Sequence, residues 1–354
     1  MTVAADCQQP SRLRHRAWVS VLVGIGLSAF LAYLAARRVH WSEALQTLHR
    51  VEYRYLVLAA FGAVAMHGLR AWRLTVLLRP VRQVRAWPAF CYTAVGFLAI
   101  LAFPFRIGEL ARPLLLAEYE EVPFATGLAT IAVERCLDGL AFAGLITLAT
   151  PWLPLPEWAA PLGYLLGIGY LLLLGLFVGA WLFRESCVVI IARMGRRVSP
   201  TRGAAIGEAA RRFLDGLAFL PDTAAFGEAV LLSAAIWLAG IGVNYASFFA
   251  LGLMLPVVAA AALQILVTLG VLLPTAPGFV GNFHYFAMMA VGLYGVEQAP
   301  ALAFAVLTHA TILVVNVSLG IGCGMVLQRG LWARLWGFAS AQDEKADARG
   351  GDLP

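Results

Sequence analysis

Long apolar runs dominate this chain and restrict it to one broad class of fold. Hydrophobic residues make up 61% of the 354 residues, and charged residues only 13%. Several of the runs exceed the roughly 20 apolar residues that a helix needs to cross a bilayer. We therefore predict an all-α polytopic membrane protein that forms a single membrane domain over residues 1–354 and has no nucleic-acid partner.

Six of these runs are long enough to be complete spans, and two more are interrupted. The predicted spans are residues 17–36, 55–78, 123–150, 161–183, 226–252 and 299–327. The interrupted stretches are residues 86–121 and 257–295. Segment 37–54, which contains Trp41, is expected to lie in the membrane interface as an amphipathic helix.

The distribution of arginine predicts how the chain crosses the membrane. Basic residues cluster before the first span, after the second span, within segment 184–225 and in the tail 328–354. Basic segments next to spans stay on the cytoplasmic side. All four clusters lie there if the six spans cross and each interrupted stretch is a re-entrant hairpin. This predicts a protein of the bacterial inner membrane with both termini, the basic loop 184–225 and the tail in the cytoplasm.

The order of these elements indicates an inverted repeat. Residues 17–150 form one unit with a hairpin between its second and third spans, and residues 161–327 form a second unit of the same kind. Because each unit makes three crossings, the second must be inverted relative to the first. Broken helices that meet near the midplane of such a repeat form the substrate site of many transporters.

Both interrupted stretches contain Pro-x-x-x-Gly followed by Glu or Asn, at residues 104–109 and 277–282. A helix that begins inside the bilayer directs free N–H groups and a partial positive charge at whatever precedes it. An anionic group such as a lipid phosphate suits that position. In the second stretch, Pro277-Gly278 and Gly281 let the chain turn, and Asn282 is expected to cap the helix that follows.

Six ionisable residues lie at predicted membrane depth, three just after the first break and three inside the predicted span 123–150. Such groups usually face the interior of a bundle or a wet cavity. Arginine forks match phosphate oxygens, so Arg106 and Arg112 are the strongest candidates for binding an anion, and Glu109 is expected to orient an arginine. The alternative is a set of buried ion pairs that fix helix register. The six residues are Arg106, Glu109, Arg112, Glu134, Arg135 and Asp138.

The corresponding positions of the second half are polar but uncharged. For His284 and His309, a substrate-binding role and a packing role both stay open. Arg70 and Arg73 end the second span, and their long side chains are expected to reach the headgroups at the membrane surface. The scattered cysteines indicate no metal site, and no cofactor is expected.

Taken in order, these motifs resemble the transmembrane region of the lysylphosphatidylglycerol synthase family of flippase-like proteins, over about residues 15–330. The resemblance implies a module that translocates lipid, with a membrane lipid and a lipid-modifying enzyme as partners, and it allows a homo-oligomer. It also implies a carboxylate just after the glycine of the second break, where this chain has Asn282 and His284. The matching motifs are Arg106-Ile-Gly-Glu with Arg112, Glu134-Arg with Asp138, Leu273-Pro-Thr-Ala-Pro-Gly with Gly281, and Arg70-Ala-Trp-Arg.

Three functions fit these features. The first is a flippase or scramblase that moves an anionic lipid between leaflets, namely a phospholipid, an aminoacyl-phospholipid or a polyprenyl-linked lipid. The second is a membrane-embedded headgroup or glycosyl transferase with Glu134 or Asp138 as a base, and the third is an ion-coupled transporter of a small anionic solute. The sequence has no Asp-x-Asp pair, His-Glu-x-x-His motif or nucleotide-binding loop. We therefore expect a transporter without catalytic residues, and not an enzyme.

Overall fold

The computed structural model describes residues 24–37, 39–198, 203–273 and 276–350, with the side chains of the last helix described through residue 328. These parts of the chain form helices and no β-strand, which confirms the all-α prediction. The arginines before the first span, and the beginning of that span, lie outside the described residues.

Outside segment 184–225, the helices follow the predicted segments, and each predicted span begins or ends within a few residues of a helix boundary. Three short 3-10 helices, η1 to η3, separate some of them. In chain order the elements are Gly24–Ala36, α2 (Trp41–His49), α3 (Tyr53–Leu78), α4 (Ala86–Ala102), η1 (Pro104–Leu110), α5 (Ala111–Glu120), α6 (Phe124–Ala149), η2 (Thr150–Trp152), α7 (Ala159–Leu182), α8 (Arg184–Val198), α9 (Gly203–Asp215), α10 (Thr223–Ala250), α11 (Val257–Leu272), η3 (Pro277–Phe279), α12 (Asn282–Gly292) and α13 (Gln298–Gly350).

Among the described residues, four helices are long and apolar enough to cross a membrane. They are α3, α7, α10 and the part Gln298–Gln328 of α13. Helix α6 has the same 26-residue length as α3 but carries Glu134, Arg135 and Asp138 within its apolar sequence. The chain is therefore a helical membrane protein, while the count of six spans and the inverted repeat stay predictions.

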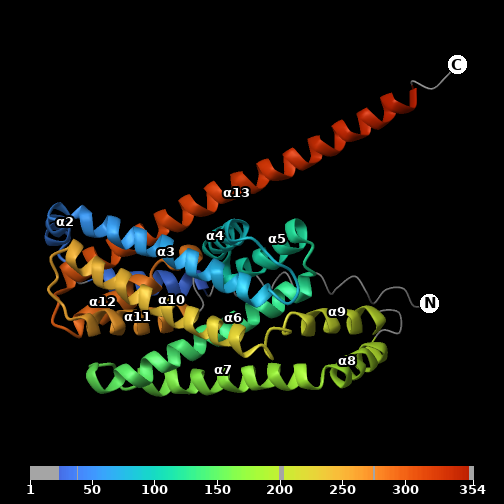
Figure 1. The fold of residues 1–354 in the computed structure, drawn as a ribbon. Coiled ribbons are helices and arrows are strands. Elements are labelled where there is room, and N and C mark those ends of the chain that lie inside the picture. The colour runs from blue at the N-terminus through green and yellow to red at the C-terminus, as the bar shows by residue number, and fades with distance from the viewer. Residues whose placement is uncertain (1–23, 38, 199–202, 274–275, 351–354) are drawn as a thin grey trace, which may run out of the picture.

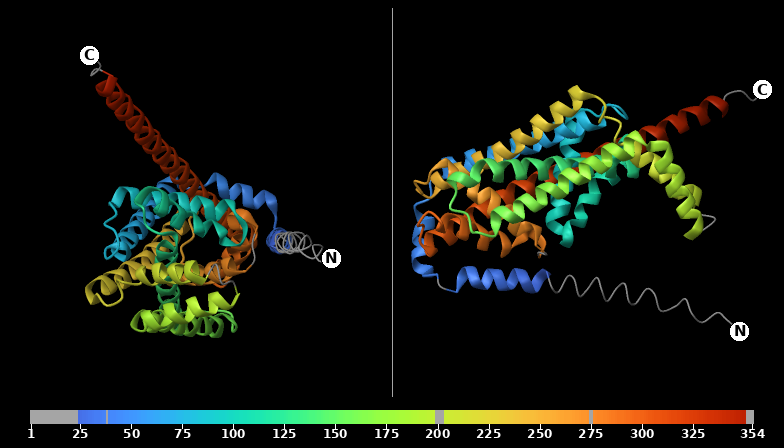
Figure 2. Two further views of the ribbon diagram at one scale, coloured as in Figure 1. Left: turned by 90° about the vertical axis from the view of Figure 1, so that its right-hand side faces the viewer. Right: turned by 90° about the horizontal axis from the view of Figure 1, so that it is seen from below.

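The bundle has two ends with different contacts (Figures 1 and 2). At one end, α2 packs against α13, and the N–H of Glu52 donates to the carbonyl of Ala250 at 2.8 Å. At the other end, Arg79 pairs with Glu228 at 2.6 Å, and α6 packs against α9. Helices α8 and α9 lie at this second end, and α13 projects beyond the other helices.

The first interrupted stretch folds into an antiparallel helical hairpin. Gly108 of η1 packs directly on the backbone of Ala99 in α4, close to the break. Farther from the break, the Tyr92 hydroxyl of α4 donates to the Glu120 carboxylate of α5 at 2.7 Å. In the second stretch, α11 and α12 likewise pack against each other on either side of η3, and η3 also contacts α4. The two breaks therefore lie near each other inside the bundle.

The largest hydrophobic core fills the space between α6, α10, α11, α12 and α13. Much of it is alanine, as at Ala259, Ala262, Ala287 and Ala290, all buried. Small residues let helix backbones approach closely. In a membrane, where the hydrophobic effect does not drive helices together, such close packing stabilises their association.

Segment 184–225, predicted to be a basic loop, contains two helices, α8 and α9, that pack against each other. Its charged side chains are partly paired, since Arg184 lies 3.3 Å from Asp215 and Arg212 lies 2.8 Å from Glu208. The tail 328–354 is continuous with α13 through Gly350.

Candidate functional site

The first break positions two charged side chains by an unusual backbone conformation. Arg106 has a φ of 57°, in the left-handed region that residues other than glycine rarely adopt. At Gly108, a Cβ would lie 2.1 Å from the carbonyl carbon of Ala99, so only glycine lets η1 approach α4 this closely. The break thereby places Arg106 and Glu109 in the wall of a cavity.

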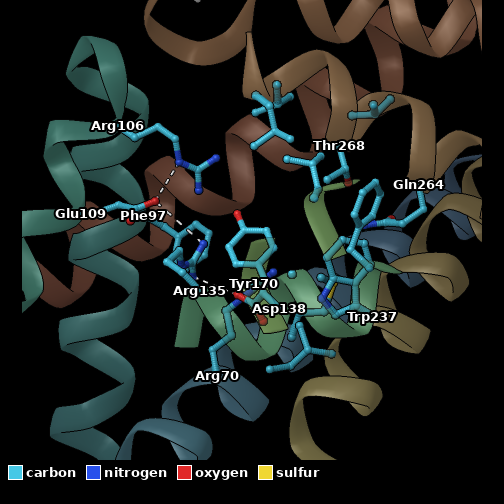
Figure 3. A pocket seen from close by; sticks show the side chains of 18 residues that line it. Arg70, Phe97, Arg106, Glu109, Arg135, Asp138, Tyr170, Trp237, Gln264 and Thr268 are labelled. Carbon is cyan, nitrogen blue, oxygen red and sulfur yellow. Dashed lines mark hydrogen bonds and ion pairs between the residues drawn. The ribbon is translucent and has the colours of Figure 1, made fainter. Parts of the chain in front are cut away.

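This cavity is the larger of two that adjoin each other. Its volume is about 520 Å³, within the range of small-molecule sites. Charged residues from α3, η1 and α6 line one part of it, and aromatic and amide side chains from α7, α10 and α11 line another (Figure 3). The charged lining residues are Arg70, Arg106, Glu109, Arg135 and Asp138. The cavity therefore offers both ionic and neutral polar groups to a ligand.

A smaller cavity of about 280 Å³ adjoins the first, because both are lined by Arg70, Phe97 and Arg106. Its other lining residues are mostly apolar and include Phe279 of the second break. The first break, η1, thus lines both cavities through Arg106, and the second break, η3, lines the smaller one through Phe279.

Two ion pairs with buried arginines lie behind and along the edge of the larger cavity. Arg112 of α5 donates to Glu134 of α6 at 2.7 Å, and both side chains are almost completely buried. Arg73 of α3 donates to Asp138 at 2.5 Å and to the Ser233 hydroxyl of α10 at 2.7 Å. These contacts join α3, α5, α6 and α10. Removing one partner would leave a buried charge uncompensated.

Nearer the cavity, the ion pairs are more accessible. Arg106 donates to Glu109 at 2.8 Å, and the Arg106 side chain is 36% exposed. Arg135 lies 3.0 Å from Asp138 and 3.9 Å from Glu109. The Arg70 guanidinium lies over the Phe97 ring at 4.7 Å, and it joins none of the ion pairs within this cluster.

The charges of this cluster do not balance. Its five arginines face three carboxylates, so the cluster carries a formal excess of two positive charges among the described residues. We call this set the arginine cluster. Its members are Arg70, Arg73, Arg106, Arg112, Arg135, Glu109, Glu134 and Asp138.

The structure brings the six predicted residues of the first half together, but in two different environments. Arg106, Glu109, Arg135 and Asp138 line the larger cavity. The remaining two, Arg112 and Glu134, pair with each other behind it and line neither of the two cavities. The ion-pair alternative therefore describes the contacts of these two.

The expectation that Arg70 and Arg73 reach the membrane surface is wrong. Arg73 is completely buried against Asp138, and Arg70 lines both cavities. A sequence signal for this existed, because His67, Arg70 and Arg73 recur at three-residue spacing and so share one face of α3. That face carries three polar groups where an outward-facing span would be apolar.

The second break is held by neutral hydrogen bonds. Gly278 and Gly281 have φ of 71° and 88°, and a Cβ on Gly281 would lie 2.1 Å from the carbonyl oxygen of Ser28. The Ser28 hydroxyl donates to Asn282 Oδ1 at 3.1 Å and accepts from the N–H of Ala276 at 2.8 Å. Helix Gly24–Ala36 thus supports the break between α11 and α12. Pro277 begins η3 and supplies no cavity lining.

Asn282 does not cap α12, contrary to the expectation. The N-cap position is Gly281, and Asn282 is fully buried, with its Nδ2 group donating to the carbonyl of Gly270 at 3.1 Å. Asn282 thereby bridges α11 to the Gly24–Ala36 helix, since its Oδ1 accepts from Ser28 and its Nδ2 donates to Gly270. The expectation failed because the sequence does not show that Ser28 lies beside the break.

His284 and His309 lie together beside the second break. The Nδ1 atom of His284 accepts from the N–H of Gly281 at 3.3 Å. The His309 ring stacks on Phe283 with centroids 4.5 Å apart, and it meets the His284 ring edge-on at 4.9 Å. Neither histidine lines the two cavities, so their contacts are those of the packing alternative.

Among the described residues, no group of three or more histidine, cysteine, aspartate or glutamate side chains could hold a metal ion. The carboxylates of the cavity face arginines instead, as the ion pairs above show.

Comparison with known proteins gives two results. A family model described as the lysylphosphatidylglycerol synthase TM region matches residues 21–320, which confirms the resemblance found in the motifs. The chain is also 27% identical over 366 aligned positions to a protein named glycosyltransferase AglD from Haloferax volcanii. This alignment covers 94% of the present chain and 58% of the relative, so the chain spans little more than half the length of that protein.

The similarity to a protein named a glycosyltransferase contradicts the expectation that this chain is not an enzyme. That expectation rested on three absent motifs, which is weak ground, because a membrane-embedded transferase can bind its substrates through arginines and carboxylates without any of them.

Proposed function

Since the chain belongs to the lysylphosphatidylglycerol synthase transmembrane-region family, we propose that it binds an anionic lipid headgroup and moves that lipid between membrane leaflets. The observation that carries the proposal is the positive excess of the arginine cluster beside the larger cavity, which adjoins a smaller cavity lined from both breaks. An uncompensated charge at membrane depth is costly. A lipid phosphate in the larger cavity supplies the missing negative charge.

Arg70 and Arg106 are the residues that would hold this phosphate. Both residues line the two cavities. Arg70 has no ion-pair partner within the cluster, and Arg106 has the most exposed side chain of the arginines that form ion pairs in the cluster. Guanidinium groups donate paired N–H bonds to phosphate oxygens. Glu109 would release Arg106 to the phosphate and take it back when the site is empty.

The smaller cavity gives the apolar part of the lipid a place beside its headgroup. Phe97, Val267, Val271 and Phe279 line it, with Arg70 and Arg106 at the side shared with the larger cavity. In this proposal the two broken helices are re-entrant hairpins of a six-span inverted repeat, with both termini in the cytoplasm of a bacterium. The headgroup crosses between the breaks while the chains stay in apolar surroundings.

Leaflet exchange in liposomes tests the proposal. Purified protein is reconstituted with fluorescent phosphatidylglycerol, and dithionite quenching reports the lipid that reaches the outer leaflet. We expect exchange with the natural sequence and at least a tenfold slower initial rate for Arg70→Gln and Arg106→Gln. Arg54→Gln is the matched control, because Arg54 is exposed and pairs with Glu52 far from the cavity.

Two results would count against this proposal. One is the absence of exchange for anionic phospholipids and polyprenyl phosphates alike. The other is loss of exchange in Arg54→Gln to the same degree as in Arg70→Gln, which would point to a general effect of charge. Thermal unfolding of each variant in detergent separates a lost site from a lost fold.

A second candidate is transfer of a glycosyl group to or from a lipid, which the relative named glycosyltransferase AglD favours. The cavity carboxylates Glu109 and Asp138 would then act on the acceptor. Incubation of proteoliposomes with radiolabelled nucleotide sugars or lipid-linked sugars would show a new labelled product. A labelled product formed in the absence of leaflet exchange would favour this candidate over translocation.

A further inference from the structure

The wall of the larger cavity that lies across from Arg106 and Glu109 carries aromatic rings (Figure 3). Trp237 of α10 and Tyr170 of α7 both line the cavity. Trp237 packs on Phe142 with ring centroids 5.6 Å apart. Tyr170 lies so close to α6 that a Cβ on Gly139 would be 2.0 Å from its ring. These rings are therefore held in place before any ligand arrives.

Neutral hydrogen-bonding groups lie beside the rings. Gln264 and Thr268 of α11 line the same wall (Figure 3). Asn244 donates to Oε1 of Gln264 at 2.9 Å, which fixes the orientation of the Gln264 amide. An amide and a hydroxyl together provide both donors and acceptors. Groups of this kind bind hydroxyls, and they add no charge.

The charge of the arginine cluster disfavours headgroups that carry a free ammonium group. Each carboxylate of the arginine cluster already faces at least one arginine: Glu109 faces Arg106, Glu134 faces Arg112, and Asp138 faces Arg73 and Arg135. A headgroup with a free ammonium, such as a lysyl ester, would add a further positive charge to a cluster that already carries an excess of two. Like charges at this depth repel strongly because little solvent screens them.

We propose that the headgroup bound here is a phosphate-linked sugar, with the phosphate on Arg70 and Arg106 and the sugar on the wall formed by Trp237, Tyr170, Gln264 and Thr268. A sugar ring has an apolar face that stacks on an aromatic ring, and hydroxyls that bond to an amide and a hydroxyl. This inference rests on the proposed function for the site, and it narrows the substrate to lipids with a glycosyl phosphate headgroup.

Equilibrium binding to the full-length protein in detergent tests this without requiring transport. The probes are glucose 1-phosphate, glycerol 3-phosphate and lysine methyl ester, measured by isothermal titration calorimetry. We expect glucose 1-phosphate to bind at least tenfold more tightly than glycerol 3-phosphate, and lysine methyl ester not to bind. Trp237→Leu should weaken glucose 1-phosphate at least tenfold and change glycerol 3-phosphate less than twofold.

Two variants control this experiment. Trp152→Leu removes a tryptophan that is 72% exposed and lines neither cavity, and it should leave all affinities unchanged. Gln264→Leu removes the amide from the same wall and should likewise weaken binding of glucose 1-phosphate but not of glycerol 3-phosphate. It provides a second test of the sugar site if Trp237→Leu does not fold.

The inference is overturned if glucose 1-phosphate binds no more tightly than glycerol 3-phosphate, if Trp237→Leu weakens both probes equally, or if lysine methyl ester binds best. Leaflet exchange of a fluorescent polyprenyl glycosyl phosphate, measured beside fluorescent phosphatidylglycerol, then separates failure of the sugar assignment from failure of translocation. Lipid exchange without selective sugar binding would reject only the assignment of a sugar headgroup. Selective sugar binding without exchange of any lipid would reject translocation but retain the proposed binding site.

Discussion

The two broken helices of this protein begin from the same Pro-x-x-x-Gly pattern and are held in place by opposite chemistry. The hairpin α4–α5 is tied to the bundle by buried charge, through Arg112 and Glu134. The hairpin α11–α12 is tied by neutral groups, through Ser28 and Asn282. Both breaks contribute to the smaller cavity, the first through Arg106 and the second through Phe279. The same sequence pattern can thus form the turn at both breaks. The residues around each break determine whether ion pairs or neutral hydrogen bonds hold it in place.

This difference indicates that one hairpin binds the substrate and the other provides structural support for the cavity. On the proposed function, the charged hairpin binds the phosphate through Arg106, and its partner supplies apolar wall through Phe279. Substitutions at equivalent depth in the two hairpins should therefore differ strongly in their effect.

The largest effect on stability is expected at Glu134. Glu134→Gln keeps the shape of the side chain but leaves Arg112 and Arg73 without its charge. Breaking a buried ion pair in this way costs about 3–5 kcal/mol. Thermal and denaturant unfolding of detergent-solubilised protein measures the loss.

The matched substitution in the second half is Thr308→Val, because Thr308 is buried and aligning the two units of the predicted repeat places it opposite Glu134. Its hydroxyl has no hydrogen-bond partner in the described part of the chain. It should change stability by less than about 1 kcal/mol. Equal losses in the two variants would show that charge is not what distinguishes the hairpins.

The next largest effect is expected at Gly281. In Gly281→Ala, the new Cβ would meet the Ser28 carbonyl oxygen at 2.1 Å, in a backbone with φ of 88°. Strain of this kind costs about 1–3 kcal/mol before any displacement of the Gly24–Ala36 helix. Gly292→Ala, where the Cβ meets no atom within 4 Å, should stay within about 1 kcal/mol. Similar melting temperatures for both variants would argue against the close approach to Ser28.

A smaller effect is expected at Ser28 itself. Ser28→Ala removes two hydrogen bonds, to Asn282 and from the N–H of Ala276, and should cost about 1–2 kcal/mol. Ser247→Ala is the control, because the buried Ser247 hydroxyl donates only to Val243 of its own helix. It should stay within about 0.5 kcal/mol of the natural protein. If Ser28→Ala is no worse than Ser247→Ala in thermal unfolding, the first helix does not support the second break.

The smallest effect on stability is expected at Arg70. Because Arg70 contacts Phe97 and joins none of the ion pairs in the cluster, Arg70→Gln should cost only about 0.5–1 kcal/mol, the value of the cation–π contact. Its leaflet exchange should nevertheless fall at least tenfold, as proposed above. A destabilisation as large as that of Glu134→Gln would place Arg70 among the structural charges.

Most of the helices could be predicted from the sequence, because apolar runs and breaks are local features. The predicted stretch 86–121 is α4, η1 and α5, and the stretch 257–295 is α11, η3 and α12. Four of the six predicted charged residues line the larger cavity. Each of these expectations needed only neighbours along the chain.

The remaining features depend on contacts between distant segments. Arg73 is buried because Asp138 lies opposite it, and Asn282 turns inward because Ser28 lies beside it. Neither partner can be inferred from spacing within one helix. The excess charge of the cluster was missed for the same reason, since it depends on Arg70 and Arg73 joining residues that follow them by many positions.

The polar residues of α6 also constrain how this protein enters its membrane. A charged residue at the centre of a helix raises the cost of partitioning into lipid by about 2.5–3.5 kcal/mol on insertion scales, and α6 carries Glu134, Arg135 and Asp138. Such a segment is poorly retained in lipid alone. Arg73 on α3 is synthesised earlier and can neutralise Asp138, whereas Ser233 on α10 arrives later. On the predicted six-span topology, we therefore expect α6 to insert stably only while α3 stays beside it, so that assembly would begin before the chain is complete.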